Sequence, residues 1–224
     1  MTPEIISQIR SGGILYVLLV IAITMREFGR AYAADKLGCV LPRMQGRVTV
    51  NPLAHMDMLG TVVFPIACIA LSTGTGFPLI FGWGKPVEAG FSNPKTFARD
   101  DVIFTLSGAS ANLVIALISA LLLTLFHAFG LEDFATVAGF SIMINAILFV
   151  INMLPVPPLD GGRLLKHATG MSDSTYMAFA RYGIFIFFAL VFFPPTKKVI
   201  MFLFNLVSAV FFGIAELLTG IFVK

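Results

Sequence analysis

Three long stretches without a charged residue constrain this chain more than any other feature. No Asp, Glu, Lys or Arg occurs over Met58–Gly84, Val102–Leu131 or Phe134–Leu159, which are 27, 30 and 26 residues long. Each stretch exceeds the about 20 apolar residues that cross a bilayer as a helix. Charged residues make up 12% of the 224 residues, about half their share in soluble domains, which excludes an ordinary soluble or disordered protein. The sequence therefore predicts an integral, multi-pass membrane protein.

The predicted fold is all-α, a single transmembrane domain over residues 1–224 with about six transmembrane helices. Prolines break the chain at the Pro155–Asp160 segment, and a short helix to Gly170 is expected after it. In the first loop, Gln45–Pro52 alternates and ends in a breaker, which predicts a short β-hairpin. The balance of basic residues between the two sides does not decide the orientation. The expected spans are Gly12–Leu37, Met58–Ile80 with a bend at Pro65, Asp101–Phe129, Asp133–Asn152, Ser174–Phe193 and Lys197–Phe222.

Charge and cysteine content exclude several kinds of partner. The net charge of +3 comes from basic residues placed mostly at helix ends and in loops, as membrane proteins place them at the headgroup boundary. No nucleic-acid partner is expected; the lipid bilayer is the expected environment. The two cysteines, Cys39 and Cys68, form no framework and are interpreted as free thiols.

Three charged residues lie close together near the end of the first expected helix. At 100° per residue, Arg26, Glu27 and Arg30 face one sector of that helix, and Arg30 can pair with Glu27 at i,i+3. Ionisable side chains at membrane depth are candidates for a functional site. The alternative is a helix end where the charged groups reach the interface.

A second candidate site follows the fourth expected span. Three prolines in Pro155–Pro158 cannot continue a helix, and broken backbone at membrane depth is tolerated where it is buried in protein or lines a wet cavity. Asp160 would then begin a new half-helix, with Gly161 and Gly162 allowing close approach. The alternative is an Asp that caps a helix in a surface turn.

Five sequence blocks, in this order, resemble a small member of the site-2 protease family. Together they extend over about Tyr16 to Gly170 and are more specific than any single motif. The resemblance implies an intramembrane zinc metalloprotease architecture of about six helices. The blocks are Arg26–Gly38, Gly46–Asp57, Phe81–Val87, Ser107–Asn112 and Asn152–Arg163.

The resemblance also implies roles for individual residues. Glu27 stands where the family has the glutamate of its H-E-x-x-H motif, which activates a zinc-bound water. Asp160 stands at the family's third zinc ligand. Further positions imply contact with a client, a membrane-protein segment that pairs with an edge strand. These substrate-binding positions are Asn112, Asn152, Val48 and Val50.

Both positions of the family's zinc-binding histidines are arginine here, Arg26 and Arg30. Arginine has no lone pair to offer a metal, and Asp160 alone cannot supply the three protein ligands of a catalytic zinc. No zinc is therefore expected, although zinc is the family's cofactor. Two guanidinium groups against two carboxylates would keep the net charge of the zinc site, so we expect a cluster of Arg26, Arg30, Glu27 and Asp160.

The three histidines are not expected to rebuild a metal site. His55 and His167 lack a partner at i+3 or i+4. His55 is expected to anchor its loop through a hydrogen bond, His167 to lie at headgroup level, and His127 to lie near the interface at a helix end.

Three functions follow from these observations. The first is a catalytically inactive pseudoprotease that binds membrane-protein segments. The second is an active intramembrane zinc metalloprotease, or an inactivated variant of one, with Glu27 as its catalytic base. The third is a transporter with a broken-helix polar site. The resemblance implies a prokaryotic inner membrane.

Overall fold

The computed structural model describes residues 3–72 and 80–222, and these residues form two compact units that divide between Gly90 and Phe91. Within the described ranges the chain is helical and contains no β-strand. A single isolated antiparallel bridge is found there, between Met56 and Gly84. The all-α prediction is therefore confirmed. Each unit is described by itself below.

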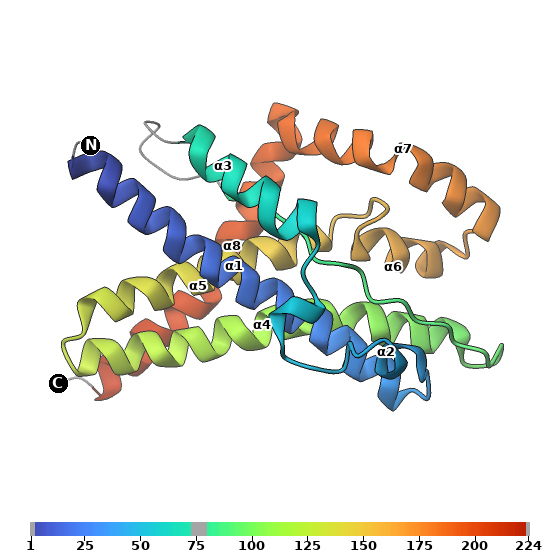
Figure 1. Cartoon of the computed structure of the whole chain (residues 1–224), viewed down its shortest axis with the longest axis horizontal. Helices are drawn as coiled ribbons and strands as arrows, with labels where there is room; N and C mark the ends of the chain where they lie inside the picture. Colours follow the sequence, from blue (N-terminus) through green and yellow to red (C-terminus); the bar gives the residue numbers. More distant parts are fainter. Residues whose placement is uncertain (1–2, 73–79, 223–224) are drawn as a thin grey trace. The chain divides into compact units, whose positions relative to one another are not determined.

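The first unit is built around one long helix. Helix α1 extends over Pro3–Lys36 and so begins well before the expected Gly12. It ends because Gly38 adopts a left-handed conformation with φ 87°, the usual stop for a helix. The short helices α2 (Leu41–Met44) and η1 (Pro52–Ala54) follow in the loop, and Figure 1 labels α1 and α2.

The second expected span begins at Met58, as predicted. Its first turns, η2 (Met58–Val63), are π-helical, and α-helical geometry starts with α3 (Phe64–Ser72), next to the expected bend at Pro65. Asp57 caps the start, because its Oδ1 accepts the N–H of Gly60 at 2.6 Å. The remainder of the expected helix, residues 73–79, lies outside the described residues.

The β-hairpin expected in the first loop is wrong. Residues 46–50 form a turn and bends, with Gly46 in the left-handed region at φ 65°. The N–H of Arg47 bonds to the carbonyl of Pro42 at 2.8 Å, and the side chain of Asn51 accepts the N–H of Leu53 at 3.1 Å. These local hydrogen bonds satisfy backbone groups that a strand would pair with a neighbour.

The core of the second unit lies between three helices. Helices α4 (Phe97–Ala128) and α5 (Glu132–Asn152) run side by side, joined by a tight turn at Gly130 (Figure 1). Helix α8 (Pro194–Phe222) packs on both. Small residues dominate the contact and allow the backbones to approach closely. The core residues include Ala116, Ala120, Ala138, Ile142, Phe211 and Ala215.

The proline-rich break is confirmed. Helix α5 ends at Asn152, and the chain turns through Pro155, Pro157 and Pro158 before α6 (Asp160–Thr169) begins. Helix α7 (Asp173–Phe192) follows, with the hydroxyl of Ser172 accepting the N–H of Thr175 at its start. The sequence therefore places Asp160 correctly at the start of a short new helix.

Five helices of the described residues are long and apolar enough to cross a membrane: α1, α4, α5, α7 and α8. The apolar segment Met58–Leu71 is shorter than these. The prediction of a multi-pass membrane protein is supported at this level, whereas the expected number of six spans is not confirmed.

Candidate functional site

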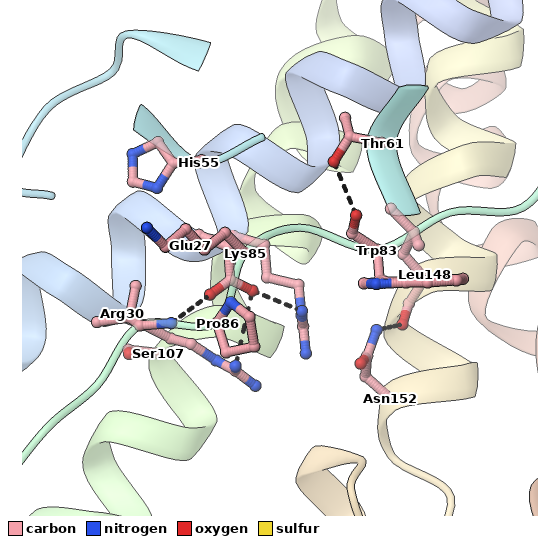
Figure 2. A network of polar contacts seen from close by, with 12 residues as sticks. Glu27, Arg30, His55, Thr61, Trp83, Lys85, Pro86, Ser107, Leu148 and Asn152 are labelled. Carbon is pink, nitrogen blue, oxygen red and sulfur yellow. Dashed lines mark hydrogen bonds and ion pairs between the residues drawn. The ribbon is translucent and has the colours of Figure 1, made fainter. Parts of the chain in front are cut away.

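The charged residues of α1 form a buried ion-pair cluster. Arg26 Nη1 lies 2.7 Å from Glu27 Oε1, and Arg30 Nη1 lies 3.6 Å from the same oxygen. The side chain of Glu27 is 1% exposed, and those of Arg26 and Arg30 are 11% and 10% exposed. Figure 2 shows Glu27 and Arg30 pointing toward each other. The i,i+3 pair expected from the helical spacing is therefore confirmed.

The second oxygen of the Glu27 carboxylate is contacted by an extended segment that follows α3 in the sequence. The N–H of Val87 donates to Glu27 Oε2 at 3.3 Å. Gly84 lies so close to α1 that a Cβ there would be 2.6 Å from Ile23 Cγ2 and 3.3 Å from Glu27 Cγ. A glycine at 84 thus permits the close approach that brings Val87 to the carboxylate.

Arg47 holds the same segment from the loop side. Its guanidinium donates to the carbonyl of Pro86 at 3.3 Å and to the carbonyl of Lys85. Arg47 is 3% exposed. Burial lowers the pKa of Arg47, and the negative charges of Glu27 and Glu88 oppose that effect. The Pro86–Val87 peptide group therefore lies between a guanidinium and a carboxylate.

His55 completes this arrangement as a neutral ring. Its Nε2 lies 2.7 Å from the carbonyl of Thr49, and its Nδ1 lies 3.4 Å from Arg47 Nη2. A carbonyl can only accept and a guanidinium can only donate, so Nε2 carries the proton and Nδ1 accepts. Burial lowers the pKa of His55, the Thr49 carbonyl raises it in part, and the charge of Arg47 lowers it further. The expected loop-anchoring role of His55 is confirmed.

Two hydrogen bonds tie the backbone of the extended segment to the start of η2. The N–H of Trp83 donates to the carbonyl of Gly60 at 3.0 Å, and the hydroxyl of Thr61 donates to the carbonyl of Trp83 at 2.8 Å. Figure 2 shows the Thr61–Trp83 bond. The N–H of Lys85 also donates to the carbonyl of His55 at 2.8 Å. Trp83 thus bonds to η2 and Lys85 to the first loop, and these contacts position Val87 at Glu27.

In the second unit, Asp160 is the first residue of α6 and is 1% exposed. The two glycines that follow it pack against backbone. A Cβ at Gly161 would collide with the carbonyl oxygens of Met153 and Leu154, and one at Gly162 would collide with Pro157. Asp160 is therefore held in a buried turn and not in the surface turn that was the alternative.

An ion pair and a histidine–carboxylate contact hold α6 to α4. His167 Nε2 lies 2.7 Å from Asp101 Oδ2, and Arg163 Nη2 lies 3.7 Å from Asp101 Oδ1. The Arg163 guanidinium also lies over the ring of Phe104, 5.5 Å from its centroid. His167 thus has a specific acidic partner, which its expected role at headgroup level did not include. His127 lies in the last turn of α4, at a helix end as expected.

The two asparagines predicted near the site have different surroundings. Asn112 on α4 donates through Nδ2 to Asn145 Oδ1 on α5 at 3.0 Å, and both side chains are buried. Asn152 donates to the carbonyl of Leu148 on its own helix at 2.7 Å, as Figure 2 shows. The amide oxygen of Asn112 is buried without a hydrogen-bond partner in the described part of the chain.

The structure brings Arg26, Glu27 and Arg30 together in the first unit and places Asp160 in the second. The cluster of all four charges therefore stays a prediction. The sequence did not lead us to three parts of the site: the N–H of Val87, the contacts of Arg47 with the extended segment, and Asn145. An arginine next to the breaker-rich stretch and an asparagine inside an uncharged span were the available signals for the last two.

The donor set around Glu27 does not fit a zinc ion. Arg26 and Arg30 have N–H donors and no free lone pair, whereas zinc in proteins takes Cys, His, Asp or Glu ligands. No group of three or more such residues that could hold a metal ion is found in residues 3–72 and 80–222.

Comparisons with known proteins give a consistent result. Residues 126–194 match the sequence profile described as Peptidase family M50. The chain is 32% identical over 197 residues to "Putative zinc metalloprotease YwhC" of Bacillus subtilis (strain 168), with 84% of this chain and 83% of that protein covered. No solved structure matches the chain at a significant level.

Two mycobacterial proteins with one name are also similar. "Putative zinc metalloprotease Rip2" of Mycolicibacterium smegmatis is 29% identical over 181 residues, covering 79% of this chain and 66% of that protein. Its namesake of Mycobacterium tuberculosis (strain H37Rv) is 26% identical over 197 residues, covering 86% and 73%.

Five described helices long and apolar enough to cross a membrane are typical of an integral membrane protein of the helical class. The similarity to the Bacillus protein covers most of both chains and shows the family of this chain. This chain belongs to peptidase family M50, the site-2 protease family.

Proposed function

We propose that this chain is a catalytically inactive member of the site-2 protease family that binds segments of membrane proteins. One observation carries the proposal. Arg26 and Arg30 flank a buried Glu27, at the positions where the resemblance places the two zinc-binding histidines, and both contact its carboxylate. A carboxylate stabilised by two guanidinium groups is a weaker base toward water.

The proposal follows from the chemistry of the donors. Arginine stays protonated and cannot ligate a metal through its guanidinium. A catalytic zinc needs three protein ligands and one open position, and Asp160 is the single residue of the family's three ligand positions that has a suitable side chain. Glu27 then has a structural role: its carboxylate neutralises Arg26 and Arg30 and accepts the N–H of Val87.

A more specific part of this proposal is that Arg26, Arg30, Glu27 and Asp160 form one cluster of charges. In it, Asp160 supplies the second carboxylate and brings the charge of the set to zero. A double-mutant cycle of Arg30→Gln and Asp160→Asn tests it through the thermal midpoint of the purified protein. We expect the two effects to be strongly non-additive, as they are for residues in contact. Additive effects would contradict the cluster.

Client binding is the retained activity in this proposal. The family acts on membrane-protein substrates, and a chain without the metal can keep the surface that receives them. Val48 and Val50 in the first loop, with Asn112 and Asn152, are the proposed contact residues. The exposure of Val50, at 59%, supports a contact role for this residue. The bacterial relatives favour a prokaryotic inner membrane as the location.

An active zinc metalloprotease is the second candidate, and the names of the three relatives favour it. It would require metal ligands other than Arg26 and Arg30. Glu27 would be the catalytic base in that case.

Metal content and cleavage together separate the two candidates. We expect purified protein to contain no stoichiometric zinc and to leave a single-span reporter uncut. The double variant Arg26→His, Arg30→His should bind about one zinc per chain, and each single reversion should bind much less, since a site needs three convergent ligands. Reporter cleavage by the unmodified chain that stops with a chelator and in Glu27→Gln would overturn the proposal.

We also propose that residues 1–224 make one transmembrane domain with six spans, the sixth formed by the segment that begins at Met58. Six spans place both termini on the same side of the membrane. Reporter fusions at the two ends measure this, and opposite locations would favour five spans.

A further inference from the structure

Helix α8 has two faces of different character. One face packs into the core of the second unit through Ser208, Phe211 and Ala215, which are 7%, 8% and 3% exposed. Thr124 on α4 donates to the carbonyl of Ala215 at 3.1 Å and fixes this packing. At 100° per residue, Gly213, Leu217 and Gly220 lie on the opposite face, and Glu216 lies at the edge of that face, next to Ala215.

A groove of about 480 Å³ lies along that opposite face. Its lining residues all come from α8 and are Gly213, Glu216, Leu217, Gly220 and Ile221. A Cβ at Gly213 or Gly220 would meet nothing within 4 Å. The two glycines are seven residues apart, about two turns of the helix. Because they have no side chains, the helix surface is recessed on each side of Glu216. A second helix could therefore approach α8 closely here.

Glu216 is a carboxylate at membrane depth. Between Lys198 and Lys224 it is the one charged residue in the sequence, and α8 is a candidate membrane span. The midpoint of that interval is Phe211, so Glu216 lies about 7.5 Å from it along the helix axis, inside a hydrocarbon core with a half-thickness of about 15 Å. No hydrogen bond or ion pair of Glu216 is found among the described residues. An exposed carboxylate in hydrocarbon is costly, and such residues are generally paired in the complete assembly.

We propose that this face of α8 docks a transmembrane helix of another protein that carries a lysine or arginine at the depth of Glu216. Charge complementarity selects this occupant. A basic side chain between the two glycines would neutralise the carboxylate, and the glycines would let the two backbones approach closely. A second copy of this chain would instead bring two carboxylates together at a two-fold axis. The groove lies outside residues 126–194, which match the family profile, and the proposal is independent of whether Glu27 is catalytic.

Energy transfer in phosphatidylcholine vesicles tests the proposal. The labelled full-length chain is mixed with a single-span Leu/Ala helix that carries Lys five positions from its midpoint, or with the same helix carrying Leu or Glu. We expect the Lys helix to bind about five- to thirtyfold more tightly than the Leu helix, as polar contacts between membrane helices allow. The Glu helix should bind no better than the Leu helix.

Two variants and a control for each separate charge from shape. Glu216→Gln should remove the preference for Lys over Leu, whereas Glu132→Gln, an exposed acid at the start of α5, should keep it. Gly213→Leu with Gly220→Leu should weaken binding of every helix. Gly13→Leu is the matched control, because a Cβ at Gly13 also meets nothing within 4 Å.

Two results would overturn the proposal. Equal binding of the Lys and Leu helices would mean that Glu216 reaches the lipid headgroups and selects no partner. Energy transfer between two labelled copies of this chain, abolished by Gly213→Leu with Gly220→Leu and unaffected by the Lys helix, would assign the face to self-association. Neither result bears on metal content or reporter cleavage, so failure here is distinguishable from failure of the proposed function.

Discussion

At the scale of single residues, the sequence predicts the part of the site that helix geometry controls. The pairing of Arg30 with Glu27 follows from i,i+3 spacing on a helix and is found at 3.6 Å. The shorter contact, between Arg26 and Glu27 at 2.7 Å, joins adjacent residues and depends on side-chain rotamers. The N–H of Val87 comes from 60 residues further along the chain. Such a contact depends on tertiary packing, which the local pattern does not contain.

Replacing Glu27 by Gln tests its structural role. We expect Glu27→Gln to lower the free energy of unfolding by about 3 kcal/mol, because it leaves the buried guanidinium groups without their carboxylate. The thermal midpoint in detergent measures this. Glu4→Gln, at an exposed position of the same helix, is the control and should have little effect. An unchanged or raised midpoint would point to a catalytic glutamate that is retained at the expense of stability.

The pH dependence of stability tests the neutral state of His55. Its pKa is lower in the folded protein than the about 6.5 of an unfolded chain. As the pH falls, the unfolded state therefore takes up the proton first. The contribution of His55 is fully present above about pH 6.5 and is lost as the pH falls toward its folded-state pKa.

Thermal midpoints of the wild type and His55→Gln between about pH 8 and about pH 5 measure this contribution. We expect the wild type to lose more stability on acidification than the variant does. The charged groups that act on the ring are Arg47 and Glu27. Parallel pH profiles would show that the ring is not held neutral by its surroundings.

At the scale of elements, composition and proline placement predict most of what is found. The uncharged stretches become α4 and α5, and the prolines end α5 before Asp160 begins α6. The prediction for the first loop is wrong. Alternation over Gln45–Pro52 predicts a strand, but a strand needs a partner, and the side chain of Asn51 and the turn at Gly46 bond the backbone locally instead.

The start of α6 offers a test of close packing. In Gly161→Ala the added methyl group would collide with the carbonyl oxygens of Met153 and Leu154, and backbone cannot move aside as a side chain can. We expect a loss of about 1–3 kcal/mol in the free energy of unfolding, as overpacking generally costs. Gly139→Ala on α5 is the control, because its nearest neighbour is Phe212 Cε1 at 3.7 Å. It should be neutral or slightly stabilising, since Ala favours a helix more than Gly does. Equal effects would refute the close packing at Gly161.

At the scale of the whole molecule, the scarcity of charge decides the class of protein, because a bilayer excludes unpaired charge wherever it occurs in the chain. The number of spans is harder to predict. The segment from Met58 to Leu71 is apolar but short, and its turns change from π- to α-helical geometry beside Pro65. Hydropathy alone does not distinguish a short segment that crosses the membrane from one that enters and returns.

The peptide group between Pro86 and Val87 has a consequence for communication within the first unit. Its carbonyl accepts from Arg47 and its N–H donates to Glu27, and a peptide group is a rigid plane. Tilting one end must therefore tilt the other. A molecule that pulled on the first loop would alter the surroundings of the acid on α1 without ever touching it.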